Sequence, residues 1–291
     1  MTAQVLCIGS ALWDVIGHSD RPMEIGFDRP GQISRHPGGV ALNVAYALLA
    51  ADVRPVMLTA IGTDAEGDAL VEAMSTQGVD CEHIVRVAGR TDIYMAIEHN
   101  GTLFGAVADC ASLEAAGTDL FGPLKNGAFN NGSNFDGIAV IDGNLPVPVL
   151  EHAIDSGILS DATVLFVPAS PGKAARMTAI LKAADVTLCV NRIEAEIICG
   201  RPLTTSRDAA LALAALGCSA IVTDSARPAT LVIKDEVLTT TPPDVNVLRV
   251  TGAGDAFLAG YIAGLLTHMT PSESLHNAAK TAAQHISEPG L

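Results

Sequence analysis

Short apolar runs rich in β-branched residues alternate along this chain with segments of helical periodicity. The runs lie at residues 5–9, 56–62, 137–142, 163–168, 186–190 and 220–224, and helical patterns lie at residues 42–51, 66–77, 173–184, 194–199 and 208–216. Strands that alternate with helices build βαβ units, in which helices cover both faces of a parallel sheet. The alternation therefore predicts an α/β domain with a mostly parallel central sheet flanked by helices.

Two regions interrupt this alternation. Residues 13–35 contain glycine and proline but no clear helix, and residues 91–109 hold two extended runs separated by Asn100 and Gly101. An Asn-Gly pair between extended runs is a strong hairpin signal. We expect the two regions to pair into a small β-sheet that stands off a core of residues 1–12, 36–90 and 110–291; an ordinary edge hairpin is the alternative.

The charge balance narrows the choice of partners. The chain of 291 residues has 32 acidic and 17 basic side chains, which gives a net charge of −15. Nucleic acids and anionic membranes are bound by basic surfaces, so both are disfavoured as partners. No apolar run has the length of a membrane span, and residues 5–9 are too short for the core of a signal peptide. We expect a cytoplasmic protein that acts on a small molecule.

A glycine-rich turn, Thr251 to Gly254, runs into Asp255 and then into a long apolar helix from Ala256 to about His268. The first N–H groups of a helix have no internal partner, the helix dipole is positive there, and small residues let a phosphate approach closely. The turn can therefore hold the negative charge of a transferred phosphoryl group, while Asp255 accepts a proton from an attacking hydroxyl. A helix cap without chemistry is the alternative.

A second glycine motif, Pro-Gly-Gly-Val-Ala-Leu-Asn at residues 37–43, opens another predicted helix. With these two motifs the chain resembles the PfkB, or ribokinase-like, carbohydrate and nucleoside kinases, from Ile8 to about Ala283. The resemblance implies a three-layer ribokinase-like sandwich whose small β-sheet is a substrate lid and the surface of a homodimer. It also implies ATP as phosphoryl donor and Mg²⁺ as metal ion. A monovalent cation stays open, because backbone carbonyls near Arg249 and Val250 could bind one.

The resemblance assigns catalytic and acceptor-binding roles. Asp255 is the expected base, and the turn formed by Gly252, Ala253 and Gly254 is the expected anion hole. Asp14 follows the first strand, where ligands bind in open α/β sheets, although a turn aspartate is the alternative. The residues expected to hold the acceptor are Asp14, Gly38, Gly39, Asn43, Tyr94 and Asp109.

The nucleotide side is expected at Asn191, Glu194, Thr223, Arg227, Thr251 and Asn277. Asn191 and Glu194 match the family's Asn-x-x-Glu motif, which places Mg²⁺ partly through water; a helix capping box is the alternative. Residues 224–228 replace the glycines that the family usually has there. Asp224 would repel polyphosphate unless it points away, and Arg227 could compensate. Asn277 is expected at the adenine pocket or, alternatively, on the helix surface.

Within the family, the chain is most similar to kinases that act on pseudouridine. The similarity lies in residues 8–11, 14–19, 30–33, 37–43 and 106–109. Tyr94 and Phe104 could cover a uracil ring or belong to a dimer core, and Val40 stands where ribokinase-like members often have lysine, which disfavours ribose. Two alternatives remain. One is a kinase for a free sugar, such as ribose or fructose, or for another nucleoside; the other is a non-catalytic binding protein with a decayed ATP site, because the 223–229 loop is altered and the chain ends early.

Overall fold

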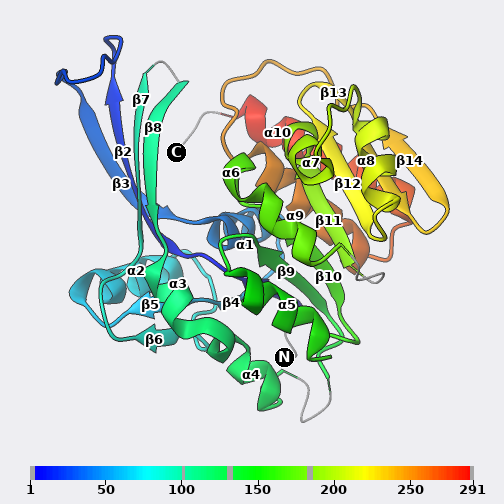
Figure 1. Ribbon diagram of the computed structural model, residues 1–291, viewed down its shortest axis with the longest axis horizontal. Helices are drawn as coiled ribbons and strands as arrows, with labels where there is room; N and C mark the ends of the chain where they lie inside the picture. Colours follow the sequence, from blue (N-terminus) through cyan, green and yellow to red (C-terminus); the bar gives the residue numbers. More distant parts are fainter. Residues whose placement is uncertain (1–3, 100–101, 130–133, 182–185, 289–291) are drawn as a thin grey trace.

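The computed structural model describes residues 4–99, 102–129, 134–181 and 186–288. Its large sheet has eight strands in the order β14-β13-β12-β11-β10-β9-β1-β4 (Figure 1). These strands are β1 (Val5–Ile8), β4 (Val56–Leu58), β9 (Ile138–Asp142), β10 (Thr163–Val167), β11 (Val186–Asn191), β12 (Ser219–Asp224), β13 (Arg227–Ile233) and β14 (Glu236–Thr240). The six strands from β12 to β4 are parallel, and β13 and β14 extend the sheet antiparallel.

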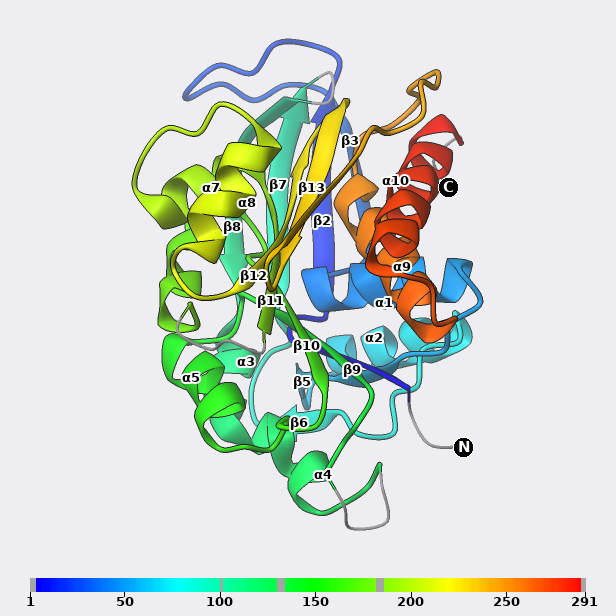
Figure 2. The same ribbon diagram turned by 90° about the vertical axis from the view of Figure 1, so that its right-hand side faces the viewer.

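Helices cover both faces of this sheet, as the view of Figure 2 shows. One face carries α3 (Ala111–Ala116), α5 (Val147–Asp155), α6 (Pro171–Ala174), the 3₁₀ turns η1 (Gly117–Phe121) and η2 (Ala175–Ala179), α7 (Arg192–Cys199) and α8 (Ser206–Ala214). The other face carries α1 (Val40–Ala50), α2 (Ala65–Thr76), α9 (Ala253–Leu266) and α10 (Pro271–Ser287). Successive residues of a strand face opposite sides of the sheet and therefore pack against both helical layers. In β1, Leu6 and Ile8 pack against the first layer, and Val5 and Cys7 pack against the second.

Four further strands form a separate small sheet in the order β3-β2-β7-β8. They are β2 (Leu12–Ser19), β3 (Gln32–Gly38), β7 (Ile93–His99) and β8 (Thr102–Asp109), and they stand upright beside the large sheet in Figure 1. The register pairs Asp14 with His36 and with Tyr94, so these three side chains share one face. The predicted turn at Asn100 and Gly101 lies outside the described residues, and the flanking strands β7 and β8 pair antiparallel.

The structure has the predicted ribokinase-like α/β architecture and corrects several details. The apolar run 56–62 is two strands, because β4 pairs with β1 whereas β5 (Ala60–Gly62) pairs with β6 (Val85–Val87). The helix expected at 173–184 is the short α6 followed by η2, and α4 (Gly122–Lys125) and the antiparallel pair β13–β14 were not predicted. Among the described residues, no helix combines the length and apolarity needed to cross a membrane.

Candidate active site

A buried carboxylate organises the carboxyl ends of the central strands. Asp142, the last residue of β9, has no solvent exposure. Its Oδ2 accepts hydrogen bonds from Ser10 N at 2.8 Å, Ser10 Oγ at 2.6 Å and Ala41 N at 3.0 Å, and its Oδ1 accepts from Asn144 N at 2.9 Å. Asp142 therefore joins the loop after β1, the first turn of α1 and the loop after β9. Sequence reasoning missed it; the available signal was an aspartate that ends an apolar strand.

The two glycines before α1 let polar groups approach closely. A Cβ on Gly38 would lie 1.9 Å from Asp14 Oδ2, and a Cβ on Gly39, whose φ is +103°, would lie 2.6 Å from the Ser10 carbonyl oxygen. Val40 N donates to Ser10 Oγ at 2.9 Å. The structure thus brings the predicted Asp14, Gly38 and Gly39 together, at the start of the helix that carries Asn43 in its first turn.

The environment of Asp14 suits an acceptor with hydroxyl groups. Burial raises its pKa to about 6, against a smaller lowering by His36. Tyr94 lies opposite Asp14 in the strand register and shares its face. Asp109 pairs with Ile93, the residue before Tyr94, so it belongs to the opposite face of the sheet. Its Oδ1 accepts a hydrogen bond from Ala111 N at 3.2 Å. Of the two lid residues predicted for the acceptor, only Tyr94 therefore lies on the Asp14 side.

The anion turn is shorter than predicted, because α9 begins at Ala253 rather than at Ala256. Gly252 is the N-cap with a φ of +81°, which reverses the chain, so Gly254 already has helical geometry. Ala253 N donates within the turn to the Val250 carbonyl at 3.2 Å. Within the described part of the chain, the N–H groups of Gly254 and Asp255 have no acceptor and remain available to an anion.

Asp255 is the third residue of α9 and is half-buried. Although part of it reaches solvent, the protein packed around its carboxyl raises the pKa to about 7, and the nearby Asp142 raises it further by repulsion. A carboxylate with a pKa near neutrality is suited to proton transfer at physiological pH. The predicted base therefore stands beside the free N–H groups of α9.

A histidine that was not predicted holds the anion turn in place. His285 Nε2 lies 3.0 Å from the Thr251 carbonyl oxygen, and Arg249 Nη2 lies 3.2 Å from His285 Nδ1. A guanidinium only donates and a carbonyl only accepts, so the two contacts assign the proton to Nε2. Arg249 Nε also donates to the His285 backbone carbonyl at 2.9 Å. The end of α10 thereby holds both Arg249 and Thr251, the residues that lead into the turn.

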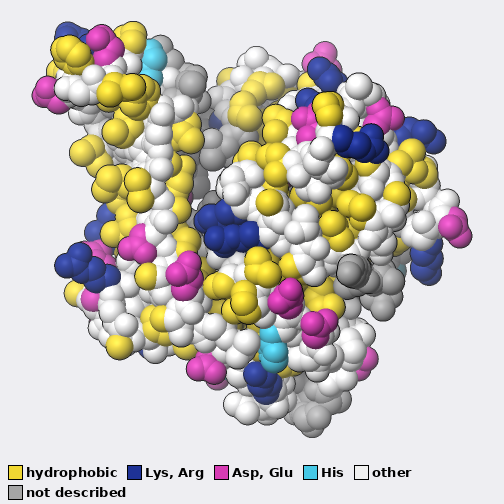
Figure 3. Space-filling view, in the orientation of Figure 1, with side chains coloured by type: hydrophobic (Ala, Val, Ile, Leu, Met, Phe, Trp, Pro, Cys, Tyr) yellow, Lys and Arg dark blue, Asp and Glu magenta, His cyan; other side chains and the backbone are white. Residues whose placement is uncertain are grey.

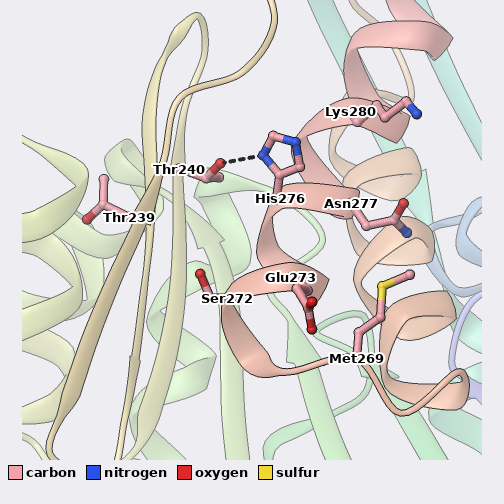
Figure 4. A pocket seen from close by; sticks show the side chains of 8 residues that line it. All are labelled: Thr239, Thr240, Met269, Ser272, Glu273, His276, Asn277 and Lys280. Carbon is pink, nitrogen blue, oxygen red and sulfur yellow. Dashed lines mark hydrogen bonds between the residues drawn. The ribbon is translucent and has the colours of Figure 1, made fainter.

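Asn277 lies elsewhere on α10. Its Nδ2 donates to the Gly260 carbonyl in α9 at 2.7 Å, so the side chain ties the two helices together. It also lines an open, polar pocket between β14 and α10, where His276 Nδ1 lies 3.4 Å from Thr240 Oγ1 (Figure 4). No residue of the anion turn lines this pocket. The adenine role of Asn277 stays a prediction.

Asn191 and Glu194 form the capping box that was the alternative to a nucleotide role. Glu194 N donates to Asn191 Oδ1 and Asn191 N donates to Glu194 Oε2, both at 2.9 Å. Burial raises the pKa of Glu194. The described residues contain no cluster of three or more His, Cys, Asp or Glu suited to a metal. A single carboxylate still fits Mg²⁺, which proteins usually hold through one or two carboxylates together with phosphates and water.

Asp224, the acidic residue that follows Thr223, is paired with two arginines. Arg192 Nε donates to Asp224 Oδ1 at 3.1 Å, and Arg227 Nη1 donates to Asp224 Oδ2 at 3.3 Å. Arg227 keeps 68% of its side-chain surface exposed, whereas Asp224 exposes only 11%. The two guanidinium groups offset the repulsion that Asp224 would exert on polyphosphate.

A base beside a helix N-terminus, across from glycines and a carboxylate that suit hydroxyl groups, defines a phosphotransferase acting on an alcohol group. The model of the pfkB family of carbohydrate kinases matches residues 2–291, and the chain belongs to this family. It is 28% identical over 290 residues to the pseudouridine kinase of Escherichia coli (strain K12). The alignment covers 97% of this chain and 90% of that kinase. The predicted family and enzyme class are confirmed.

Solved structures agree with this fold. A carbohydrate kinase from Agrobacterium tumefaciens superposes with a TM-score of 0.78 at 26% identity, over 97% of this chain and 90% of the other. A ribokinase from Arabidopsis thaliana, solved with ribose and ATP, superposes with a TM-score of 0.80 over 100% of this chain and 94% of the other. Its identity is 19%, so this likeness shows the fold alone.

The first prediction concerns Asp255→Asn. We expect kcat/KM to fall by roughly 10²-fold or more, the scale of a lost acid–base group. Asp255 accepts a proton only when ionised, so wild-type kcat/KM should rise with pH through about 7, the value to which the pKa is raised. The variant should lose this rise. Steady-state rates between pH 5.5 and 9 measure both effects, and near-normal turnover in the variant would refute the role of Asp255.

The same variant should remain folded. Burial raises the pKa of Asp255 from 3.8 to about 7, so the folded state favours the protonated carboxyl. That contribution to stability is complete below the ordinary pKa and is lost as pH rises through about 7. Asparagine stays neutral, so at pH 8 the variant should melt no lower than the wild type. A lower Tm at pH 8 would mean that the loss of activity reflects misfolding.

The second prediction concerns His285→Ala, which removes the contact to the Thr251 carbonyl. We expect kcat to fall about 10- to 10²-fold, because a small misplacement of a reacting group has effects of this size. His285→Gln, whose amide can still donate to that carbonyl, should recover part of the loss. Equal activity of the alanine and wild-type proteins would show that the turn keeps its geometry without His285.

Proposed function

We propose that this kinase transfers the γ-phosphoryl group of ATP to the 5′-hydroxyl of pseudouridine. The observation that carries the chemistry is Asp255, placed in the first turn of α9 beside two N–H groups without an acceptor. The choice of acceptor is supported by the similarity to the Escherichia coli pseudouridine kinase, which extends over 97% of this chain.

In the proposed mechanism the acceptor lies between Asp14, Gly39 and Asn43, and the small sheet closes over it as a lid to exclude water. Asp255 accepts the proton of the 5′-hydroxyl as the oxygen attacks the γ-phosphorus in line. The N–H groups of Gly254 and Asp255 hold the developing negative charge.

On the nucleotide side we propose that Thr223, Thr251 and the exposed Arg227 face the phosphates, with Asn277 toward the adenine. Mg²⁺ would be held near Glu194, in part through water, and would supply neutralisation of the charge that develops on the phosphate oxygens. Arg227 is anchored to Asp224 at 3.3 Å and remains largely exposed, so a phosphate could take a second of its donors.

One aromatic residue of the small sheet supports a flat acceptor. Tyr94 shares the face of Asp14, whereas Phe104 lies at a register shift of β8, between Leu103, which pairs with Glu98, and Gly105, which pairs with Ile97. Tyr94 is half-buried, so its ring has surface to offer a base. An aromatic face suits a flat nucleobase better than it suits a free sugar.

The third prediction tests this function by release of ADP from Mg·ATP with pseudouridine, uridine, adenosine, ribose and fructose as acceptors. We expect turnover with pseudouridine above the others, and turnover lower by roughly 10²-fold or more in Asp255→Asn. Preference for another acceptor would keep the mechanism and discard the substrate. No turnover with any acceptor, together with no rise in Tm on addition of ATP, would favour a binding protein without catalysis.

We also propose a homodimer formed through the lid. Ile33, Ile93, Met95, Ile97 and Val107 share the face of the small sheet opposite Asp14, and we name them the apolar face. Their exposed fractions run from 37% for Ile93 to 80% for Ile33. Contiguous exposed apolar surface marks an interaction site, and a second copy offers the matching surface.

The fourth prediction follows from the apolar face. Met95→Glu should weaken dimerisation by at least about 10-fold, because it would bury a charge in the interface. Leu216→Glu, at an exposed apolar residue of the main domain, should leave the dimer intact. Light scattering across a dilution series measures both. A wild-type monomer at all concentrations, or a dimer unaffected by Met95→Glu, would refute this interface.

A further inference from the structure

Lys173 is a half-buried cation in a strongly acidic protein, and none of the described carboxylates forms an ion pair with it. The side chain comes from α6 and donates through Nζ to Asn144 Oδ1, and Nζ lies 4.0 Å from Cys110 Sγ. Within the described ranges it makes no ion pair. Figure 3 shows Lys and Arg side chains gathered in the notch between the small sheet and the main domain, where a ligand could reach them.

The partner of Lys173 is itself held in place. Asn144 Nδ2 donates to Ser10 Oγ at 2.8 Å, and Ser10 Oγ in turn accepts from Val40 N at the start of α1. Arg176 Nη1 donates to the carbonyl oxygens of Gly143 at 3.2 Å and Asn144 at 3.1 Å. The ammonium group of Lys173 is therefore fixed to the same polar network that positions the glycines of the acceptor site.

Lys173 and Asp255 approach this network from opposite layers. Lys173 belongs to the layer of α5 to α8, whereas Asp255 belongs to α9 in the other layer. Asp142 connects the two sides: Asn144, the partner of Lys173, donates to Asp142 Oδ2 at 3.3 Å, and the Asp142 charge contributes to the raised pKa of Asp255. In the proposed mechanism the reacting hydroxyl lies at Asp255 of α9, so an acceptor that spans this network would present its other end to Lys173.

The chemistry of an ammonium group narrows what it binds. It carries three donors and no acceptor, and only one donor is used by Asn144. A half-buried cation without a counter-charge is costly unless its donors are satisfied. A free sugar would place only hydroxyl groups near the site, whereas the base of a nucleoside presents carbonyl oxygens at the end remote from the 5′-hydroxyl.

We propose that Lys173 donates a hydrogen bond to a carbonyl oxygen of the acceptor's base and thereby selects a nucleoside over a free sugar. This assignment rests on the proposed kinase function and deepens it. It makes Lys173, with Asn144 as its support, a specificity-determining residue of the acceptor site. Neither residue was singled out by sequence reasoning.

The test is Lys173→Met, which keeps the length of the side chain and removes its charge and donors. We expect kcat/KM for pseudouridine to fall about 10- to 10²-fold, mainly through KM, the scale of a lost hydrogen bond from a charged group. With ribose, which has the 5′-hydroxyl but no base, kcat/KM should change less than about 2-fold by the same reasoning. Lys125→Met, at an exposed lysine of α4, is the matched control.

Equal losses with pseudouridine and ribose would overturn the proposal, because Lys173 would then act on phosphoryl transfer or on the loop itself. No loss with either acceptor would overturn it as well. If the wild type binds but does not phosphorylate these acceptors, the proposed function fails on its own. Calorimetric Kd values for pseudouridine and ribose then make the same comparison, with weaker binding of pseudouridine alone supporting Lys173. A Tm of the variant within a few degrees of wild type excludes misfolding.

Discussion

The part of the site proposed to bind the substrate alcohol depends on the hydrogen bonds that the Asp142 carboxylate accepts. Its oxygens accept from Ser10, Ala41 and Asn144, which belong to three segments far apart in the chain. Removing the carboxylate would take this acceptor from three buried backbone N–H groups and from the Ser10 hydroxyl, at a cost of about 1–3 kcal/mol for each group left unpaired. Gly9 is part of the same arrangement, because a Cβ there would lie 2.4 Å from Asp142 Cγ. One carboxylate thus fixes where α1 starts and where the loop after β9 runs.

Burial determines the electrostatic character of the two candidate carboxyl groups more than Asp142 does. The protein packed around its carboxyl, and to a lesser degree repulsion by Asp142, raises the pKa of Asp255 to about 7, while burial raises that of Asp14 to about 6. Groups of this kind accept protons and hydrogen bonds from hydroxyls at neutral pH. In the proposed site the positive charge is local, at Lys173, Arg227 and the N-terminus of α9, despite a net charge of −15. A negative global charge is therefore compatible with the binding of a nucleotide.

The layers and the two glycine motifs could be predicted, because strand and helix periods and φ-positive glycines are local properties. The partners in space could not: Ser10 and Asp142 are 132 residues apart, and no spacing links His285 to Thr251. The Asn-x-x-Glu motif of Asn191 and Glu194 was ambiguous for another reason, since a capping box and a metal site use the same residues at the same spacing. The anion turn was placed too long because Gly254 is compatible with both turn and helix.

In the proposed dimer the small sheet would link the acceptor to the second copy, because successive residues of a strand face opposite sides of the sheet. Tyr94 and Met95 are neighbours in sequence, but Tyr94 lies on the face of Asp14 and Met95 on the apolar face. A shift of register by one residue would exchange these faces, so the pairings of β2 with β3 and β7 must be held firmly. A dimer packed on the apolar face would restrain the same four strands that carry Asp14 and Tyr94. Assembly and acceptor binding would then be coupled through a rigid sheet.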